Sequence, residues 1–381
     1  MRVAIVTESF LPVVNGVTNS VLRVLEHLRA GGHQALVVAP GTGPPEHEGT
    51  AVVRVRSVGL PGYRSVAVGL PTFRLAAVLD DFAPDVVHLA SPIAVGALGA
   101  HVAARAGVPA VAVYQTDVAG FAARYGLRPA QRAVWAWLRR VHAACARTLA
   151  PSSQAMWDLR QHGIDDVHLW ARGVDGTAFA PGHRDPALRA ALTPGGELLV
   201  GYVGRLAAEK RVELLAPLQD LAGVRVVIVG DGPARPALER RMPRAVFLGF
   251  RAGRALSTVF ASLDVFVHTG ADETYCQAAQ EALASGVPVV APAAGGLLDV
   301  VTDGATGLLW PAEEPAALVA AVRSLVADQP RRRRLAAAAR TSVVARSWDA
   351  IGDQLLGHYR AVLRGTRRQG APVLVEGRET A

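Results

Sequence analysis

Two glutamates, Glu273 and Glu281, are the residues whose type and spacing most clearly suit chemistry on a ligand. In the segment 264–288 an apolar run leads into a loop with Glu273 and then into a helical pattern with Glu281. Eight residues of helix rise about 12 Å, close to the reach from the ribose to the hexose of a nucleotide sugar. Carboxylates accept hydrogen bonds from hydroxyl groups, and the helix N-terminus between them would face the diphosphate. Taken alone, the spacing would favour a simpler interpretation, an N-cap region followed by one exposed helical glutamate.

A basic pair, Arg205 and Lys210, follows the apolar run 198–203 and a glycine, before a helical pattern. Lys210 is the only lysine, because the other 39 of the 40 basic residues are arginine. Lysine offers a compact charge and arginine a planar fork, so the two are not interchangeable at a phosphate. The position at a strand-to-helix turn, where α/β proteins bind phosphates, favours a diphosphate contact over the chance survival of one lysine.

Other candidate site residues carry weaker signals. Gly16 lies where the chain enters its first helix, and a glycine there lets backbone N–H groups approach a phosphate. His88 ends a predicted strand near the expected cleft and is a lesser candidate. The eleven histidines have no metal-ligand spacing, and the chain contains no Asp-x-Asp motif. We therefore expect no metal site.

Short β-rich runs alternate with helical patterns in both halves of the chain, as parallel sheets require. The predicted strands are 3–7, 35–39, 86–89, 110–114, 198–203, 225–229, 246–248, 265–268, 287–291 and 307–310. The predicted helices are 17–30, 71–80, 95–106, 131–147, 211–221, 235–241, 255–262, 277–285, 315–327, 330–345 and 348–363. The predicted organisation is a first domain at 1–171, a linker at 172–182, a second domain at 183–345, a helix at 346–364 and a disordered tail at 365–381.

Composition narrows the classes of protein. A chain of 381 residues suits two domains, and 51% hydrophobic with 19% charged residues is typical of a globular protein. The net charge of +8 favours an anionic partner, such as a nucleotide or a membrane surface, and no nucleic-acid-binding module is recognisable. Two cysteines give no disulfide framework. The first apolar run is too short for a signal peptide, so we expect the cytoplasm, with peripheral contact at the inner face of the plasma membrane left open.

Taken together, these motifs resemble the retaining glycosyltransferases of family four. The resemblance rests on Gly16, the Gly-Arg-Leu-x-x-Glu-Lys stretch, the Glu-x7-Glu element and the closing segment 291–296, and it extends to about residue 363. Within the family the chain looks most like the actinobacterial GDP-mannose-dependent α-mannosyltransferases that build mannosylated glycolipids. The resemblance implies the GT-B fold, in which two Rossmann-like α/β domains with parallel sheets face a cleft. It also implies a C-terminal helix that crosses back to the first domain.

The resemblance also implies roles for the candidate residues. Arg205 and Lys210 would hold the diphosphate, Glu273 the donor sugar and Glu281 the ribose, with Gln277 beside them. Two positions depart from the broader family: Gln115 stands where many members have a histidine near the reacting sugar, and Cys276 where many have a glycine. We interpret both as characters of the actinobacterial subgroup. Asp117, two residues after Gln115, is a lesser candidate.

The predicted activity is the transfer of a hexose, mannose from GDP-mannose, to a lipid-linked hydroxyl with retention of the anomeric configuration. The basic pair would stabilise the leaving diphosphate with neither a metal nor another cofactor. Three alternatives stay open: a nucleotide-sugar 2-epimerase of the same fold, a glycosyltransferase with a soluble small-molecule acceptor, and a sugar-binding module without activity. The oligomeric state is also open.

The segment 121–147 combines basic and aromatic residues. It holds Phe121, Arg124, Arg128, Arg132, Trp135, Trp137, Arg139, Arg140 and Arg147. Such a composition suits an interfacial helix on anionic lipid. It equally suits a helix whose tryptophans pack into the first-domain core beneath a solvated arginine face. The sequence does not decide between a membrane contact and a core helix.

Overall fold

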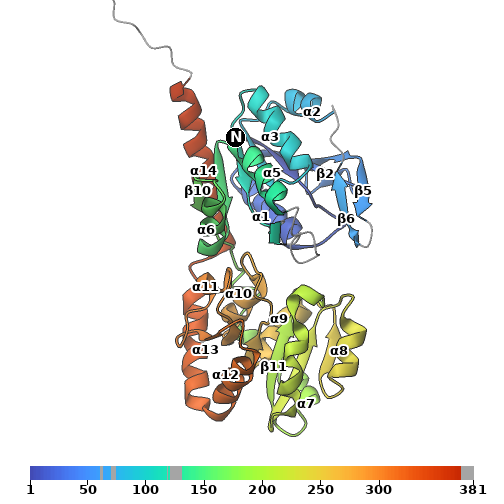
Figure 1. The fold of residues 1–381 in the computed structure, drawn as a ribbon, viewed down its shortest axis with the longest axis vertical. Helices are drawn as coiled ribbons and strands as arrows, with labels where there is room; N and C mark the ends of the chain where they lie inside the picture. Colours follow the sequence, from blue (N-terminus) through green and yellow to red (C-terminus); the bar gives the residue numbers. More distant parts are fainter. Residues whose placement is uncertain (61–62, 70–73, 118, 121–130, 370–381) are drawn as a thin grey trace, which may run out of the picture.

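The computed structural model describes residues 1–60, 63–69, 74–117, 119–120 and 131–369. It forms two lobes, one above the other in Figure 1, each built on a twisted sheet. In β1 (Arg2–Thr7) the buried residues alternate between two hydrophobic clusters, with Ile5 on one face of the sheet and Val6 on the other. A parallel sheet covered by helices on both faces requires this double-sided burial.

The first sheet has the strand order β10-β9-β8-β7-β1-β2-β4-β3, and every pair except β3 with β4 is parallel. Its strands after β1 are β2 (Gln34–Pro40), β3 (Glu46–His47), β4 (Thr50–Val55), β7 (Val86–Ala90), β8 (Ala110–Val113), β9 (Arg147–Ala150) and β10 (Val167–Leu169). A separate hairpin joins β5 (Ser57–Leu60) to β6 (Tyr63–Gly69). The helices of this lobe are α1 (Gly16–Ala30), α2 (Arg74–Phe82), α3 (Val95–Arg105), α5 (Gln131–Ala143) and α6 (Ser153–Gln161).

The second sheet has the order β13-β12-β11-β14-β15-β16 and is parallel throughout. Its strands are β11 (Leu198–Val203), β12 (Val224–Val229), β13 (Val246–Gly249), β14 (Val265–Val267), β15 (Val289–Pro292) and β16 (Gly307–Trp310). Its helices are α7 (Pro186–Leu192), α8 (Arg235–Arg241), α9 (Gly253–Ser262), α10 (Gln277–Ala284), α11 (Leu297–Val300), α12 (Pro315–Ala327) and α13 (Gln329–Val343). Short 3-10 helices are η2 (Pro181–His183), η3 (Ala208–Lys210) and η4 (Val212–Asp220).

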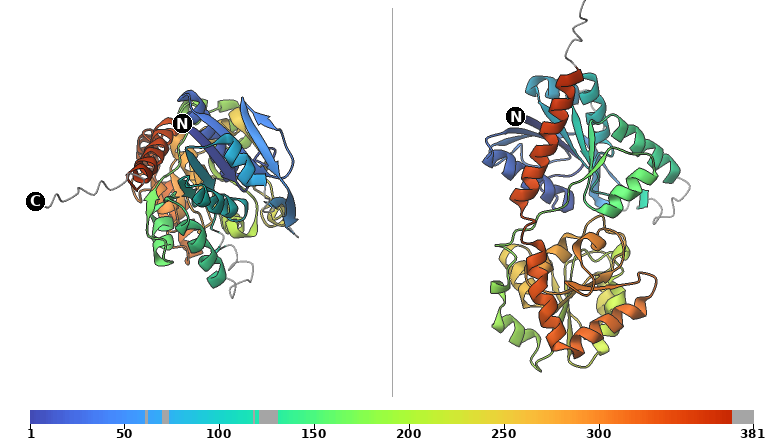
Figure 2. Two further views of the ribbon diagram at one scale, coloured as in Figure 1. Left: turned by 90° about the horizontal axis from the view of Figure 1, so that it is seen from above. Right: turned by 90° about the vertical axis from the view of Figure 1, so that its left-hand side faces the viewer.

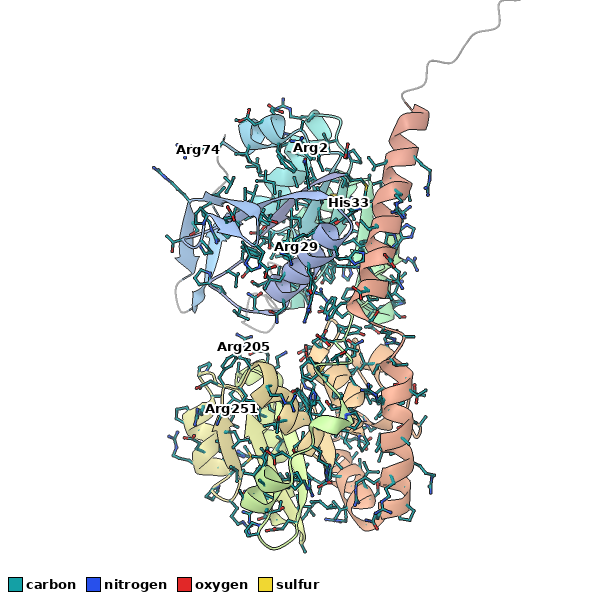
Figure 3. All side chains as sticks on the ribbon, turned by 180° about the vertical axis from the view of Figure 1, so that it is seen from behind. Arg2, Arg29, His33, Arg74, Arg205 and Arg251 are labelled. Atoms are coloured by element: carbon teal, nitrogen blue, oxygen red, sulfur yellow. The ribbon has the colours of Figure 1, made fainter. Side chains whose placement is uncertain are left out.

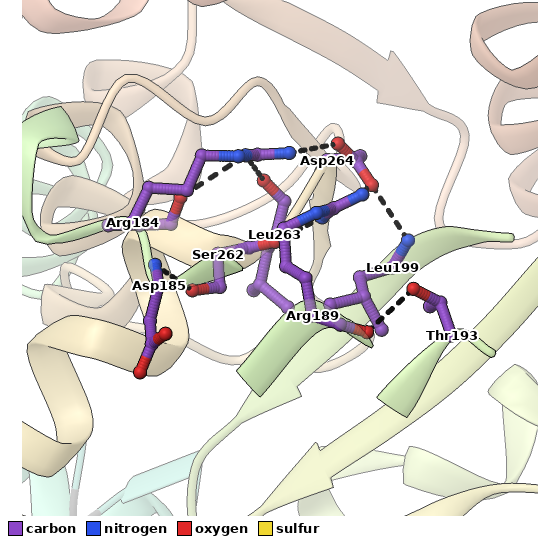
Figure 4. Close-up of polar contacts among 9 residues, drawn as sticks. Arg184, Asp185, Arg189, Thr193, Leu199, Ser262, Leu263 and Asp264 are labelled. Carbon is purple, nitrogen blue, oxygen red and sulfur yellow. Dashed lines mark hydrogen bonds and ion pairs between the residues drawn. The ribbon is translucent and has the colours of Figure 1, made fainter. Parts of the chain in front are cut away.

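A half-buried carboxylate fixes the amino-terminal edge of the second sheet (Figure 4). Asp264, just before β14, accepts a hydrogen bond from the Leu199 backbone N–H at 2.8 Å. The same carboxylate pairs with Arg184 and with Arg189, each at 2.9 Å. The start of α7 is thereby tied to the two central strands, β11 and β14, whose opposite ends carry the candidate site.

The last helix, α14 (Trp348–Gln369), runs along the first lobe, as the right-hand view of Figure 2 shows. Its apolar residues Ile351, Leu355 and Tyr359 belong to the same buried cluster as α1 and β1. Where the chain returns, the Val174 N–H donates to the Arg346 carbonyl at 2.8 Å. A side chain at Gly173 would come within 2.6 Å of the Trp348 Cα, so the crossing needs a glycine. The helix continues five residues past the predicted 364, and 370–381 lie outside the described residues.

Two predicted helices are wrong in detail. The pattern at 211–221 forms η4, a 3-10 helix, because Arg211 has a left-handed φ of 50° and Pro217 lies inside; proline removes a backbone donor from an α-helix. The helix predicted at 131–147 ends at Ala143, and Arg147 opens the strand β9. Within the described residues, no helix is both long enough and apolar enough to cross a membrane.

Candidate functional site

The candidate site lies where the strand order of the second sheet reverses. From β11 the chain moves outward through β12 and β13, and then returns to β14 on the other side of β11. In open α/β sheets, ligands bind at the carboxyl ends of the strands at such a point. The turn after β11 carries Arg205 and Lys210, and the loop after β14 carries Glu273. The fold therefore brings the predicted basic pair and the first predicted glutamate to one edge.

Glu273 is held between two cationic groups. Its Oε1 lies 2.6 Å from the Lys210 Nζ and 2.8 Å from the Nε2 of His268, a ring that is only 3% exposed and stacks on Tyr202. Burial raises the pKa of Glu273, but Lys210 and His268 outweigh it and hold the pKa below its usual value. Burial likewise lowers the pKa of Lys210 and of His268. For Lys210, the negative charge of Glu273 outweighs burial and raises the pKa above its ordinary value. For His268, Cys276 and Glu273 together outweigh burial and raise the pKa above its ordinary value. At neutral pH the site holds one carboxylate between two charged partners.

Arg205 has a different partner from Lys210. Its guanidinium pairs with Glu209, and its side chain is 52% exposed, whereas that of Lys210 is 23% exposed. Arg205 lies on the edge of the second lobe that faces the first (Figure 3). Arg205 therefore reaches a ligand only by leaving Glu209, whereas the half-buried Lys210 is held by Glu273.

The second predicted glutamate lies on α10. Glu281 is half-buried, and burial raises its pKa to about 8, with small opposing effects from Gln277 and Arg23. Gln277 itself donates from Nε2 to the Gly173 carbonyl at 3.0 Å, so its amide faces the interdomain crossing. Cys276 precedes the helix with a left-handed φ of 78°, a conformation that favours the glycine expected in the broader family.

The cluster of His268, Glu273 and Cys276 is the grouping that sequence spacing missed. Their ligand atoms all lie within 4.8 Å of one another, a set that suits a transition metal by type. A cation there would have to displace the Lys210 ammonium from Glu273 and a proton from His268. We therefore interpret the cluster as an ion-paired support for Glu273. The only signal for His268 in the sequence was its position as the last residue of the predicted strand 265–268, shortly before Glu273.

The first lobe supplies the opposite wall. Gly16 opens α1, where Asn15 caps the helix by accepting from the Thr18 N–H at 3.0 Å. A side chain at Gly16 would meet no atom within 4 Å, so the space before this helix is open. Gln115, which follows β8, is buried and contacts Thr274, the residue after Glu273. The two lobes thus meet at the sugar-contact position that the resemblance implied.

Two lesser candidates have local contacts. Asp117 accepts from the Gly120 N–H at 2.7 Å and from the Tyr114 hydroxyl at 3.2 Å. His88 lies inside β7, away from the predicted cleft-edge position: its Nδ1 is 2.7 Å from the Tyr359 hydroxyl of α14, and Trp170 packs on its ring. Burial, followed by Arg172, lowers the pKa of His88 to about 3, so the ring is neutral. His88 holds the crossing helix instead of facing the cleft.

The segment 121–147 divides between core and surface. Trp135 is buried and stacks on His162 with ring centroids 3.7 Å apart. Trp137 is 47% exposed, although its Nε1 donates to the Ile93 carbonyl at 3.0 Å. The exposed arginines of α5 are Arg132, Arg139 and Arg140. Phe121, Arg124 and Arg128 lie outside the described residues. The helix thus has one core tryptophan and a basic face with a second tryptophan.

Comparison with known proteins covers almost the whole chain. Residues 14–177 match the model of Glycosyltransferase Family 4, and residues 184–342 match that of Glycosyl transferases group 1. The GDP-mannose-dependent alpha-mannosyltransferase of Mycobacterium tuberculosis is 54% identical over 96% of this chain and 98% of its own length. The enzyme of the same name from Corynebacterium glutamicum is 49% identical, over 97% of this chain and 91% of its own.

Solved structures confirm the fold. The crystal structure of Anabaena HepE in complex with UDP superposes with a TM-score of 0.78 at 20% identity, over 95% of this chain and all of that one. The predicted GT-B arrangement of two Rossmann-like domains is confirmed. On the evidence of its two matched domains and its full-length relatives, the chain belongs to the glycosyltransferases that join a Family 4 domain to a group 1 domain.

Proposed function

We propose that this protein transfers mannose from GDP-mannose to a hydroxyl of a lipid-linked acceptor, with retention of the anomeric configuration. The observation that carries the proposal is the Lys210–Glu273 pair at the reversal point of the second sheet, in a chain about half identical to two enzymes named for GDP-mannose. To Glu281, on the following helix, we assign the contact with the ribose hydroxyls, because a carboxylate accepts hydrogen bonds from them. In this assignment Glu273 binds the sugar, Lys210 the diphosphate in the middle and Glu281 the ribose at the other end of the nucleotide sugar.

The chemistry we assign to the site is electrostatic. As the glycosidic bond breaks, negative charge develops on the diphosphate, where Lys210 and Arg205 neutralise it. No residue of the described site is an obvious nucleophile, since the carboxylate of Glu273 is already held by two cations. Attack from the same face, with the leaving phosphate taking the proton of the acceptor, gives retention without a covalent intermediate on the protein.

A donor screen tests the proposed function. The protein is incubated with GDP- and UDP-sugars and a mannosylated lipid extract, with release of nucleoside diphosphate as the signal. We expect GDP-mannose to be preferred and activity to survive EDTA, because the two basic side chains replace a metal ion. Loss on chelation with recovery on added manganese would contradict metal independence. Conversion of the sugar by donor alone would instead indicate an epimerase.

The pH dependence of donor binding tests the role of Glu281. With a pKa of about 8, its carboxyl is protonated at pH 6 in the free protein, and only the ionised form presents both of its oxygens purely as acceptors to the ribose hydroxyls. We expect GDP-mannose to bind about tenfold or more tightly at pH 8 than at pH 6, because the ionised fraction of this carboxyl falls roughly tenfold for each pH unit below its pKa. Calorimetry on the wild type and on Glu281→Gln measures this. An equally steep dependence in Glu281→Gln would assign it to another group.

Contact of α5 with an anionic membrane is a second part of the proposal. Arg139, Arg140 and the exposed Trp137 supply the basic and aromatic groups of an interfacial surface. Each arginine near anionic lipid contributes on the order of 1 kcal/mol. We expect Arg139→Gln with Arg140→Gln to reduce co-sedimentation with anionic vesicles at low salt while GDP-mannose binding is unchanged. The matched control is Arg240→Gln with Arg241→Gln, which replaces two exposed arginines on α8. If both double variants lose vesicle binding equally, net charge explains the binding and α5 is not a specific contact surface.

A further inference from the structure

A buried arginine at the junction of the two lobes has no carboxylate partner among the described residues. Arg172 is 9% exposed, and its guanidinium donates to two neutral oxygens, the Ser20 hydroxyl of α1 and the Oε1 of Gln115. Burial lowers its pKa to about 10, so the group is still charged at neutral pH. Burying a cation that has only neutral partners is unfavourable. These contacts therefore call for a functional explanation.

The backbone of Arg172 is fixed to the second lobe. Its carbonyl accepts from Gln280 Nε2 at 3.0 Å and from the Tyr275 hydroxyl at 3.4 Å. Both donors belong to the segment that carries Glu273 and Glu281. The side chain of Arg172 then reaches into the first lobe. One residue thus connects the donor-side segment to the opposite wall of the site.

Gln115 is held by that connection from two directions. Its backbone carbonyl accepts from the Thr274 hydroxyl at 3.2 Å, and its side-chain Oε1 accepts from Arg172. Arginine only donates hydrogen bonds, so the amide oxygen must face it and the amide nitrogen must face away. Within the described part of the chain, this Nε2 is buried and lacks a hydrogen-bond partner. Arg172 thereby leaves the Gln115 NH2 group oriented and unused beside the loop of Glu273 and Thr274.

We propose that Arg172 is a positioning residue that turns the Gln115 amide so that its Nε2 donates a hydrogen bond to an oxygen of the transferred sugar. The inference rests on the proposed function, because Glu273 marks the sugar end of the donor. Arg172 acts only through Gln115. The Gln115 N–H donor is oriented only where Thr274 and Arg172, both tied to the second lobe, contact Gln115 of the first lobe. The contact between the two lobes therefore completes the site.

A double-mutant cycle tests the proposal. We expect Arg172→Met and Gln115→Ala each to lower kcat about tenfold or more, as misplacement of a site group does. In the Gln115→Ala background, Arg172→Met should cost less than about twofold, because residues that act through each other are not additive. The matched control is Ser20→Ala, which removes the other partner of Arg172 and should keep kcat within about twofold. A full Arg172→Met effect in the Gln115→Ala background would overturn the proposal.

A charge variant separates positioning from stability. Gln115→Glu gives Arg172 an ionic partner but removes the N–H donor, so it should unfold at the same or higher urea concentration than the wild type and yet be as slow as Gln115→Ala. Wild-type kcat in Gln115→Glu would show that the donor is not used. The unfolding measurements need no substrate, and the kinetic cycle uses whichever donor the wild type accepts. If GDP-mannose is the wrong donor, the donor screen shows it, and the double-mutant cycle still tests the role of Arg172.

Discussion

Lys210→Ala should lower turnover at saturating donor about a hundred- to a thousandfold, which is the usual effect of removing one group that stabilises developing charge. Lys210 is half-buried in the turn after β11, and its Nζ lies 2.6 Å from the Glu273 Oε1, so its ammonium is fixed before the nucleotide sugar arrives. A preorganised charge needs no rearrangement at the moment of bond breaking. Because the chain has no other lysine, a neighbouring one is not available as a substitute.

Controls for Lys210→Ala come from the same domain. Arg225 pairs with Glu197 at 2.9 Å near the amino-terminal edge of the sheet, opposite the site, and Arg225→Ala should keep near-wild-type turnover. Lys210→Arg restores the charge with a planar group and should recover only part of the rate. Circular dichroism and the urea unfolding midpoint check the fold. If Lys210→Ala turns over at close to the wild-type rate, the diphosphate contact belongs to another residue.

The elements around the site were predictable because local pattern determines them. The runs that become β11 and β14 are rich in valine and end at turn signals, and the structure has strands at 198–203 and 265–267. Once both strands lie side by side in one parallel sheet, the residues after them must meet. The position of Lys210 near Glu273 follows from that rule and from the types of the residues.

Other features depend on contacts that no local pattern contains. β9 and β10 have only four and three residues, and the helical pattern of α5 ran on into β9 in the prediction. His88 is a polar residue within an apolar run, which resembles a site residue, but the partner that explains it is Tyr359, 271 positions away. In the sequence, Arg172 looked like the start of a linker. Its role depends on Gln115, 57 positions earlier, and no local pattern contains that contact. Pairings between residues far apart in the sequence require the folded chain.

The other large effect is on stability, from Glu273→Gln. The substitution removes a charge that Lys210 and His268 share, and leaves the buried His268 and the half-buried Lys210 without that carboxylate. Breaking a buried pair by removing one partner costs ~3–5 kcal/mol, so we expect the free energy of unfolding to fall by about 3 kcal/mol, with loss of transfer. Glu239→Gln, which removes one of the two carboxylate partners of Arg235 on an exposed helix face, should cost less than ~0.5 kcal/mol.

The pH dependence of that loss identifies the ion pairs as its cause. The pKa of Glu273 is lowered in the folded state, so its contribution is complete above its ordinary value of 4.5 and is lost as the pH falls through the folded-state pKa. The pKa of His268 is raised, so its contribution is complete below 6.5 and is lost as the pH rises through the folded-state pKa. Urea unfolding of wild type and Glu273→Gln should therefore differ most between about pH 5 and pH 6.5, and converge in acid. A difference that stays constant from pH 3 to pH 9 would mean that packing at residue 273, and not its charge, stabilises the site.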